Sequence, residues 1–468
     1  MSNVKTDALL RRLKSLAAVL LAMALLIAPT ACGSSAPAAE DSAPAEATAS
    51  DLPNEEPVEE ADESARVYSY TVTPAEGAEV DFHTDLQQAF LDNPYTDGII
   101  AMPASMEIDG ETYPIDGNPF DSADLETRER THDDWSRPDP ITLTWEGEPS
   151  DSYYVEISPD PDFGEEVRSF TTAENSVDVY NLYIGTQYYW RVAPSEELIG
   201  QGEVYSFSTS AQGPRNLYID GVTNVRDLGG YELEDGSGIV RQGLILRGGR
   251  LNLSNANDDK VTFSDEPDYF KLLITDEGLD TMLNDLGVKT ELDVRTNAEI
   301  DPSEMGYNEI GNMNNDRIPG LEYVNIPLWY YGGNMQLDNN ITRLDNPERL
   351  KEIFELLADE DNYPVFFHCN IGTDRTGTLA FLLGALCGES VDDMLVDNAF
   401  SNFGNISAGA GRTTRNNTVI TGDTGYLATV NAYPGDTLSE RTENALMDIC
   451  GISKETLDRV REILVEYY

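Results

Sequence analysis

The segment from His368 to Gly377, which reads HCNIGTDRTG, joins two apolar runs of the chain. The run before it, Tyr363 to Phe367, is typical of a short buried strand. The run that follows, as far as Cys387, is apolar on nearly every face, as in a helix buried in the middle of a domain. Between such elements, backbone N–H groups and the positive N-terminal end of the helix form a nest that binds a dianion. The segment therefore predicts an α/β layer fold with an anion site where strand meets helix.

Cys369 and Arg375 stand in this loop with five residues between them. A free thiol titrates near about 8.5, and its pKa falls by several units in an electropositive nest at a helix N-terminus. We therefore expect Cys369 to be a thiolate nucleophile and Arg375 to grip two phosphate oxygens with its planar guanidinium. The alternative is a buried thiol near a surface arginine, which is the commoner state of a cysteine. The agreement of strand, nest, helix and spacing favours the nucleophile.

The rest of the loop has predicted roles as well. Thr376 can hydrogen-bond the thiolate, His368 can brace the loop from behind, and glycine permits close backbone approach. The phosphate-binding residues that we expect are Asn370, Ile371, Gly372, Thr373, Thr376 and Gly377.

The segment resembles the phosphate-binding loop of the cysteine-dependent phosphatases. It is most similar to the bacterial tyrosine phosphatase family whose loop has aspartate immediately before the arginine, as Asp374 is here. Residues 223–230 (TNVRDLGG) are similar to the N-R-D-L-G-G opening of that family, and residues 246–251 (LRGGRL) to its R-S-x-x-L segment. Residues 292–295 (LDVR), followed by Glu299, are similar to its D-L-R-x-x-x-E motif. The resemblance implies a phosphatase domain over residues 211–468, with a central sheet flanked by helices.

Two departures from the family pattern concern the site. Gly248 stands where serine is usual, and Thr373 stands where some members carry lysine, which favours polyanionic lipid head groups. The absence of lysine weakens the case for a phosphoinositide substrate.

The same motifs supply supporting residues and two candidates for the general acid. Arg226, Asp227 and Arg247 are the supporting residues, and each arginine is read equally well as a surface charge or a substrate contact. Asp374 lies in the loop, from which related loops are thought to supply the proton. Asp293 ends a predicted strand, and its alternative role is an ion pair with Arg295. We favour Asp374 slightly.

The charge of the chain limits its partners. The formal net charge of −55, from 85 acidic and 30 basic residues, repels nucleic acid, so no nucleic-acid partner is expected. Attraction for a phosphorylated substrate must then be local, supplied by the nest and by a few arginines such as Arg226, Arg247 and Arg250. With three histidines in the chain, His83, His132 and His368, a histidine-based metal centre is not expected. The predicted mechanism needs no metal and no cofactor.

The N-terminal residues predict export. Basic residues precede an apolar run from Leu16 to Ala28, which is shorter than the about 20 residues of a spanning helix. Residues 29–33 (PTACG) then resemble a bacterial lipoprotein cleavage site, with Cys32 as the lipidated residue; the alternatives are an ordinary secretory signal and a transmembrane anchor. Residues 33–65 carry ten acidic and no basic residues and predict a disordered stalk. Lipid on Cys32 would tether the protein to the outer face of the cell membrane.

Two further regions precede the phosphatase domain. Residues 66–136 predict partial β structure, including a hairpin about Asp109-Gly110, and no function. Residues 137–210 contain short strands separated by turn residues, which is typical of an all-β sandwich domain. Leu182 and Tyr188 resemble the tyrosine-corner strand of a fibronectin type III domain; the alternative is a generic sandwich. The sequence indicates no partner for this sandwich domain.

Two smaller questions stay open in the sequence. Residues 401–436 are either a flap near the site or a plain surface loop. Cys387 and Cys450 lie in apolar helical contexts, and the spacing does not decide whether they pair.

We therefore predict an exported, membrane-tethered phosphatase that hydrolyses phosphotyrosine in protein through a phosphocysteine intermediate. The alternative substrate is an inositol phosphate or phosphoinositide. The alternative of another class is a surface adhesion protein with a vestigial phosphatase domain.

Overall fold

The computed structural model describes most of the chain from residue 67 onward. The described residues are 67–92, 105–108, 111–114, 134–147, 149–252, 273–295, 318, 320–328, 335–338, 341–344, 346–401, 403–404, 418–422 and 425–468. All of them belong to one compact unit, residues 62–468. The predicted signal segment, Cys32, the stalk, His132 and Glu299 lie outside the described residues. No helix within the described residues is long and apolar enough to cross a membrane.

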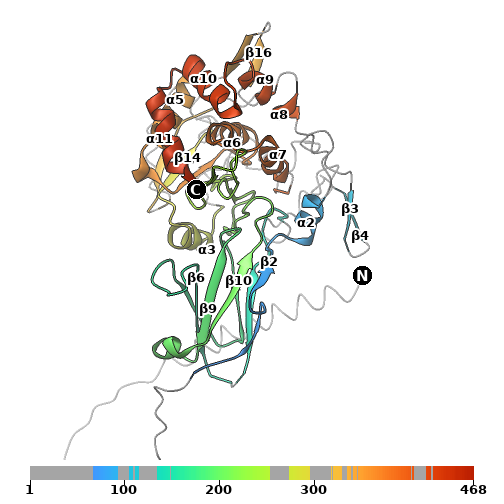
Figure 1. The fold of residues 1–468 in the computed structure, drawn as a ribbon, viewed down its shortest axis with the longest axis vertical. Helices are drawn as coiled ribbons and strands as arrows, with labels where there is room; N and C mark the ends of the chain where they lie inside the picture. The colour runs from blue at the N-terminus through green and yellow to red at the C-terminus, as the bar shows by residue number, and fades with distance from the viewer. Residues whose placement is uncertain are drawn as a thin grey trace, which may run out of the picture. The chain divides into compact units, whose positions relative to one another are not determined.

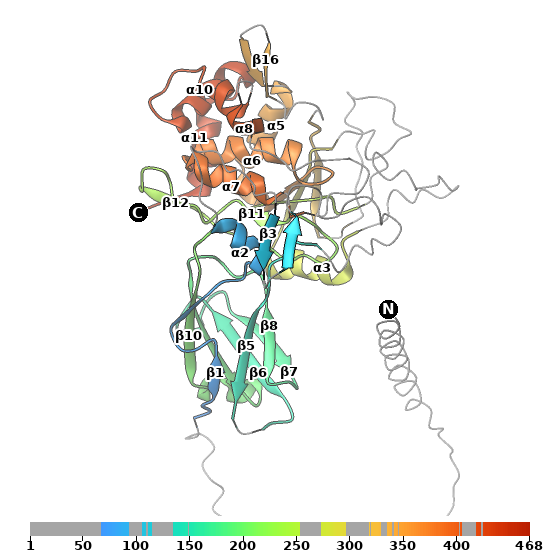
Figure 2. The same cartoon turned by 90° about the vertical axis from the view of Figure 1, so that its right-hand side faces the viewer.

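Two β-sheets make up the first half of the described chain (Figure 2). One sheet has the strand order β1 (Thr71–Thr73), β5 (Ile141–Glu146), β8 (Ser176–Val179). The other has the order β2 (Ala78–Val80), β10 (Val204–Thr209), β9 (Gln187–Ala193), β6 (Tyr153–Ser158), β7 (Arg168–Thr172). β1 and β2 come from the region before residue 137, so these sheets begin earlier in the chain than the predicted boundary.

One apolar core lies between the two sheets. β5 alternates buried and more exposed residues, as the period of two in a strand requires, and it places Leu143 and Trp145 in that core. Tyr153 and Trp190 enter the same core from the second sheet. The Tyr188 hydroxyl accepts a hydrogen bond from the Tyr183 N–H (2.8 Å), while burial raises the pKa of Tyr188 to about 12. The fibronectin type III likeness itself stays a prediction.

The region between β2 and β5 is not purely β. Helix α2 (Asp85–Leu91) begins with a capping box, in which Thr84 and Gln87 satisfy each other's backbone N–H groups. Strands β3 (Ser105–Ile108) and β4 (Glu111–Pro114) form the hairpin that the Asp109-Gly110 turn predicts. A 3₁₀ turn, η4 (Glu196–Gln201), connects β9 to β10.

A five-stranded sheet organises the second half of the chain. Its order is β11 (Arg226–Asp227), β13 (Ile245–Gly248), β18 (Val365–His368), β14 (Thr290–Asp293), β15 (Glu322–Asn325). The last four strands are parallel, and β11 pairs antiparallel with β13 at one edge. β18, the predicted strand before the loop, is central and fully buried. Val365 and Phe367 point into one core and Phe366 into the other.

Helices cover both faces of this sheet. One group of helices lies together beside the sheet (Figure 1): α5 (Pro347–Leu357), α6 (Asp374–Cys387), α7 (Val391–Phe400), α10 (Leu438–Cys450) and α11 (Lys454–Leu464). Buried residues of these helices share one core with the sheet. The other core lies against α3 (Asp276–Asp280) and the π-helical turn η6 (Thr281–Asp285). After its first residue α6 is buried throughout, which confirms the helix predicted behind the loop.

The remaining elements are short. Helix α11 ends at Leu464, because Val465 turns extended and begins β19 (Val465–Tyr467), which pairs with β12 (Gly238–Val240). The others are the hairpin β16 (Met335–Asp338) and β17 (Ile341–Leu344), the 3₁₀ turn η8 (Glu360–Asn362), and helices α8 (Thr418–Thr421) and α9 (Tyr426–Val430).

The segment predicted as a flap or a surface loop contains α8 and α9. Tyr426 and Val430 of α9 are buried, and the Tyr426 hydroxyl lies 2.7 Å from the Thr378 hydroxyl on α6. This part of the segment is therefore packed against the domain, and is not a plain surface loop. Arg412 and Arg415 lie outside the described residues.

Arg215 links the first two sheets to the five-stranded sheet. Its side chain is buried and donates to the backbone carbonyls of Asn181 (2.6 Å) and Leu182 (2.9 Å) and to the Asp227 carboxylate (2.7 Å). Asp227 also accepts from the N–H groups of Gly229 and Gly243. Asp227 therefore has a supporting role, through a junction away from the loop itself.

Candidate active site

The loop that begins at Cys369 lies at the carboxyl edge of the parallel sheet. Cys369 directly follows β18, and α6 starts at Asp374. His368 at the end of β18 is in register with Gly248 at the end of β13 and with Asp293 at the end of β14. In open α/β sheets, ligands bind outside the carboxyl ends of the strands. The motifs that are far apart in the sequence meet at this edge.

Glycine is required at two points where the loop meets β13. Gly372 has a φ of +72°, and a Cβ there would lie 2.3 Å from the carbonyl oxygen of Gly248. A Cβ on Gly248 would lie 2.7 Å from Cζ of Phe366. The ring of Phe366 therefore accounts for glycine at the position where the resembling family usually carries serine.

The loop's carbonyl groups are held from outside. The Asn224 side-chain amide donates to the carbonyls of Ile371 and Gly372, both at 3.1 Å, and an Arg247 guanidinium N–H donates to Gly372 at 2.8 Å. In a planar trans peptide the N–H points opposite to the C=O. The N–H groups of the same peptide units therefore point away from Asn224 and Arg247, as an anion-binding nest requires.

Arg226 and Arg247 share one carboxylate. Both side chains are buried, and Arg226 donates to one oxygen of Asp397 at 2.7 Å while Arg247 donates to the other. Burial by itself would raise the pKa of Asp397, but the charges of the two arginines lower it. The arginines are therefore not surface charges. They support the loop through Asp397 on α7, a residue that the sequence analysis missed; the signal was an acidic residue inside an apolar helical run.

A further arginine holds the start of the loop. Arg250 is buried, and its guanidinium donates to the side-chain oxygen of Asn370 while its backbone N–H donates to the Asn370 carbonyl (3.2 Å). The Thr373 hydroxyl donates to the Ile371 carbonyl at 3.3 Å within the loop. Position 373 therefore places no cation in the site, and its polar group is used in the fold of the loop.

Cys369 and Arg375 are both buried in the loop, with exposed fractions of 2% and 1%. Burial alone would raise the pKa of the Cys369 thiol. The charge of Arg375 and the nearby Thr376 hydroxyl outweigh burial and lower this pKa to about 7, although the charge of Asp374 acts in the opposite direction. The thiol is therefore ionised to a substantial extent at neutral pH. By contrast, burial raises the pKa of Cys450 to about 12 and raises that of Cys387. Neither of these two cysteines forms a disulfide.

Comparison with known proteins places this loop in a family. The model of the tyrosine phosphatase family matches residues 217–265 and 272–468, which is more than half of the chain. The chain belongs to the tyrosine phosphatase family. The match ends at the last residue and contains every loop residue described above. The domain with the central sheet is therefore an α/β phosphatase domain.

Two individual proteins are similar over shorter stretches. Putative tyrosine-protein phosphatase H16_A0669 of Cupriavidus necator is 28% identical over 214 residues, which are 42% of this chain and 66% of the relative. This chain thus spans just under two thirds of that relative's length. The core catalytic domain of the PP-IP phosphatase SIW14 from S. cerevisiae is 18% identical. That match covers 29% of this chain and 71% of the yeast chain, with a TM-score of 0.20.

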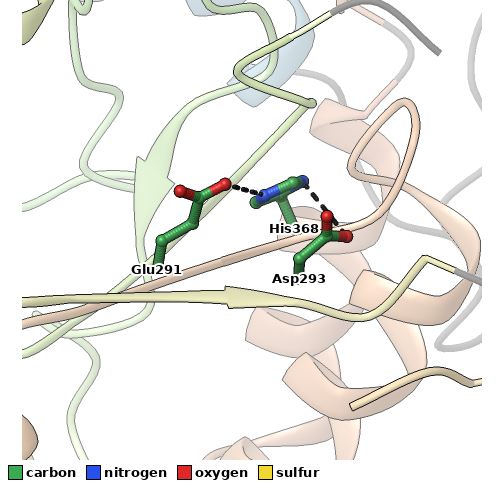
Figure 3. Close-up of side chains that lie close together, drawn as sticks. All are labelled: Glu291, Asp293 and His368. Carbon is green, nitrogen blue, oxygen red and sulfur yellow. Dashed lines mark hydrogen bonds and ion pairs between the residues drawn. The ribbon is translucent and has the colours of Figure 1, made fainter. Parts of the chain in front are cut away.

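His368 braces the phosphatase loop from behind, and its ring lies between Glu291 and Asp293 (Figure 3). Its Nδ1 lies 2.9 Å from the Cys369 carbonyl oxygen and its Nε2 lies 3.0 Å from a carboxylate oxygen of Glu291. Burial would lower the pKa of His368, but the charge of Asp293 and the hydrogen bond to Glu291 raise it. With oxygen atoms at both ring nitrogens, the imidazolium satisfies both contacts as a donor. Glu291 is a further residue that the sequence analysis missed, because it lies 77 positions from His368 in the chain.

Glu291, Asp293 and His368 are also residue types that bind metals, and they lie together. The donor atoms of His368 and Asp293 are used otherwise. Both nitrogens of His368 face oxygen atoms, and both oxygens of Asp293 accept from Arg295 at 2.6–3.0 Å. The guanidinium of Arg295 supplies the positive charge that a metal would supply. The cluster is better described as a hydrogen-bonded brace.

The two candidates for the general acid differ in their surroundings. Asp293 is fully buried. Burial would raise its pKa, but the charges of Arg295 and His368 lower it strongly, so the carboxylate keeps no proton at neutral pH. It thus has the alternative role that the sequence left open, an ion pair with Arg295. Asp374 is half-buried at the first residue of α6, near enough to Cys369 for its charge to raise the pKa of the thiol.

Proposed function

We propose that this phosphatase hydrolyses phosphotyrosine in protein through a phosphocysteine intermediate. The observation that carries the proposal is the buried Cys369 thiol beside Arg375, with a pKa of about 7, in a loop whose carbonyls are bound from outside. A vestigial site in an adhesion protein would have no use for this arrangement. The sandwich sheets supply no comparable cluster among the described residues.

In the first step the Cys369 thiolate attacks phosphorus. The S–P bond forms as the bond from phosphorus to the ester oxygen breaks, and Asp374 donates a proton to the leaving oxygen. Arg375 and the loop N–H groups bind the equatorial oxygens, where charge is concentrated in the transition state. The positive end of α6 adds to this stabilisation.

In the second step water attacks the phosphocysteine. Asp374, now a carboxylate, takes a proton from the water, the O–P bond forms and the S–P bond breaks. Phosphate leaves, and the thiolate and the protonated acid are restored. The proximity of Asp374 to the sulfur supports this assignment, as does the ion pair that occupies Asp293. The chemistry requires no metal and no cofactor.

Thr373 supports a phosphotyrosine substrate over a polyphosphorylated ring. A second or third phosphate group needs a further cation near the loop, and the Thr373 side chain is buried with its hydroxyl bonded to Ile371. The test is a comparison of kcat/KM for phosphotyrosine peptides, phosphoserine peptides and inositol phosphates. We expect phosphotyrosine peptides to be the best substrates. Preferential turnover of inositol phosphates would replace this proposal by the alternative substrate.

We also propose that the protein is exported and anchored to the outer face of the cell membrane through lipid on Cys32. The support is the basic and apolar sequence before Cys32 and the PTACG site. The acidic residues 33–65 would then hold the folded part away from the membrane, by up to about 100 Å at about 3.3 Å per residue.

A further inference from the structure

Residues 134–137 contact Asn224, one of the residues that hold the phosphatase loop. They lie about eighty residues before residue 217, where the match to the tyrosine phosphatase family model begins. Ser136 is buried, with an exposed fraction of 6%, and its hydroxyl oxygen accepts a hydrogen bond from the backbone N–H of Asn224 at 2.7 Å. Asn224 is the residue whose side-chain amide holds the carbonyls of Ile371 and Gly372. Ser136 therefore acts on the loop through a single intermediate residue, Asn224.

The orientation of the Ser136 hydroxyl is fixed by its neighbours. Because the Asn224 N–H is a donor, the Ser136 oxygen must accept from it and must direct its own proton elsewhere. That proton goes to a carboxylate oxygen of Asp134 at 2.7 Å, and the same oxygen accepts from the Ser136 N–H at 3.1 Å. Asp134, Ser136 and Asn224 therefore form one directed chain of hydrogen bonds.

Asn224 needs such support. It is a non-glycine residue with a φ of +60°, in the left-handed region that side chains other than glycine adopt at a cost. It is 1% exposed, and its side-chain oxygen accepts from Arg226 while its amide nitrogen donates to the loop. A change in the backbone of Asn224 would therefore move both loop carbonyls.

Helix α2 holds the segment in place from the other side. Gln87 is fully buried, and its side-chain amide donates to the carbonyls of Trp135 (2.7 Å) and Arg137 (3.2 Å). Phe90 of the same helix packs edge-to-face on Phe400 of α7, with ring centroids 5.6 Å apart. α2 is therefore anchored to the phosphatase domain and fixes the carbonyls on both sides of Ser136.

We propose that Ser136 is a positioning residue for the phosphate loop, acting through Asn224, and that α2 and residues 134–137 are part of the catalytic unit. This inference rests on the proposed function for its role in turnover, while its effect on the loop is independent of turnover. Loss of the Ser136 hydroxyl leaves the Asn224 N–H without its acceptor and relaxes the loop carbonyls. The loop N–H groups then bind phosphate less well and stabilise the Cys369 thiolate less.

The experiment measures alkylation of Cys369 by iodoacetamide in the full-length protein, as a function of pH and of inorganic phosphate concentration. The pH dependence gives the pKa of Cys369, and protection by phosphate gives its dissociation constant without any turnover. The variants are Ser136→Ala, Ser136→Thr and Asp134→Asn. The matched control is Ser158→Ala, which removes an equally buried hydroxyl that bonds the Glu165 carbonyl in the sandwich sheets.

We expect Ser136→Ala to raise the pKa of Cys369 and to weaken phosphate binding by about 2- to 10-fold, the effect of one buried hydrogen bond. Ser136→Thr should restore both values because it keeps the hydroxyl, and Asp134→Asn should shift both by less than Ser136→Ala. Ser158→Ala should change neither. Unchanged values in Ser136→Ala would overturn the inference. If Ser136→Ala does not fold, Asp134→Asn is the deciding variant. Unchanged values of the Cys369 pKa and of phosphate binding in Asp134→Asn would then overturn the inference. A wild-type protein that binds phosphate without hydrolysing esters would instead overturn the proposed function.

Discussion

His368 and Glu291 form a buried hydrogen bond of 3.0 Å directly behind the nucleophile. The histidine ends β18 and the glutamate lies on the neighbouring strand β14, so the pair links two strands beneath the loop. Together with the charge of Asp293, this bond raises the pKa of His368 despite its burial. The pair therefore contributes stability that depends on pH.

A histidine whose pKa is raised by folding stabilises the protein fully below its unfolded pKa of about 6.5, and this contribution is lost as pH rises through the folded pKa. We expect Glu291→Gln to lower the free energy of unfolding by about 1–3 kcal/mol at pH 6 and by less at pH 9. Denaturant unfolding at the two pH values measures the difference. Glu322→Gln, an exposed change on β15, is the control. An equal loss for Glu291→Gln at both pH values would show that the charge of His368 is not involved.

The three described cysteines should differ sharply in reactivity. Cys369 has a lowered pKa of about 7, while burial raises the pKa of Cys450 to about 12. We expect iodoacetamide to modify Cys369 with a half-maximal rate near pH 7 and to leave Cys387 and Cys450 unmodified in the folded protein. Peptide mass spectrometry after brief labelling distinguishes the sites. Labelling of Cys450 at pH 7 to the same extent as Cys369 would contradict the selective activation of Cys369 by the charge of Arg375.

Replacement of Asp374 by Asn should have an effect that depends on the leaving group. A general acid contributes about 10²- to 10⁴-fold, chiefly for a poor leaving group. We therefore expect a large loss of kcat for phosphotyrosine, a small loss for an ester of an acidic phenol, and disappearance of the basic limb of the pH profile.

Asp293→Asn is the matched comparison, because it removes the carboxylate that pairs with Arg295. Its main effect should be on stability, by about 3–5 kcal/mol, since it leaves a buried guanidinium without its counter-charge. A leaving-group-dependent loss in Asp293→Asn, with none in Asp374→Asn, would transfer the role of general acid to Asp293.

Cys32→Ala tests the proposed anchor. If Cys32 carries lipid, this variant should move from the membrane fraction to the medium or periplasm, which cell fractionation and immunoblotting can detect. Ser34→Ala, a change of similar size beside the site, should remain with the membrane. An unchanged distribution of Cys32→Ala would indicate another attachment or a simple secreted form.

The loop could be predicted from the sequence because its determinants are local. The strand, the nest and the helix follow one another in the chain, so Cys369 and Arg375 need no distant partner to be recognised. The helix after the loop and the hairpin at Asp109-Gly110 were predictable for the same reason.

The supports of the loop depend on pairings between distant segments. Arg226, Arg247 and Asp397 come from three elements, and no spacing in the sequence indicates that the two arginines share one carboxylate. Ser136 reaches Asn224 across 88 positions. The strand at the C-terminus is a similar case, since β19 forms only because β12 provides an edge for it to pair with.

The central claim is that turnover passes through a phosphoryl group on Cys369. The direct measurement is mass spectrometry of the Cys369 peptide after acid quenching of the full-length enzyme during hydrolysis of a phosphotyrosine peptide. We predict a phosphoryl adduct on Cys369 in the wild type, and neither adduct nor turnover in Cys369→Ser, because a serine hydroxyl in this nest is not ionised at neutral pH. Turnover that persists in Cys369→Ser, or a wild-type enzyme that turns over without any adduct on Cys369, would contradict the account.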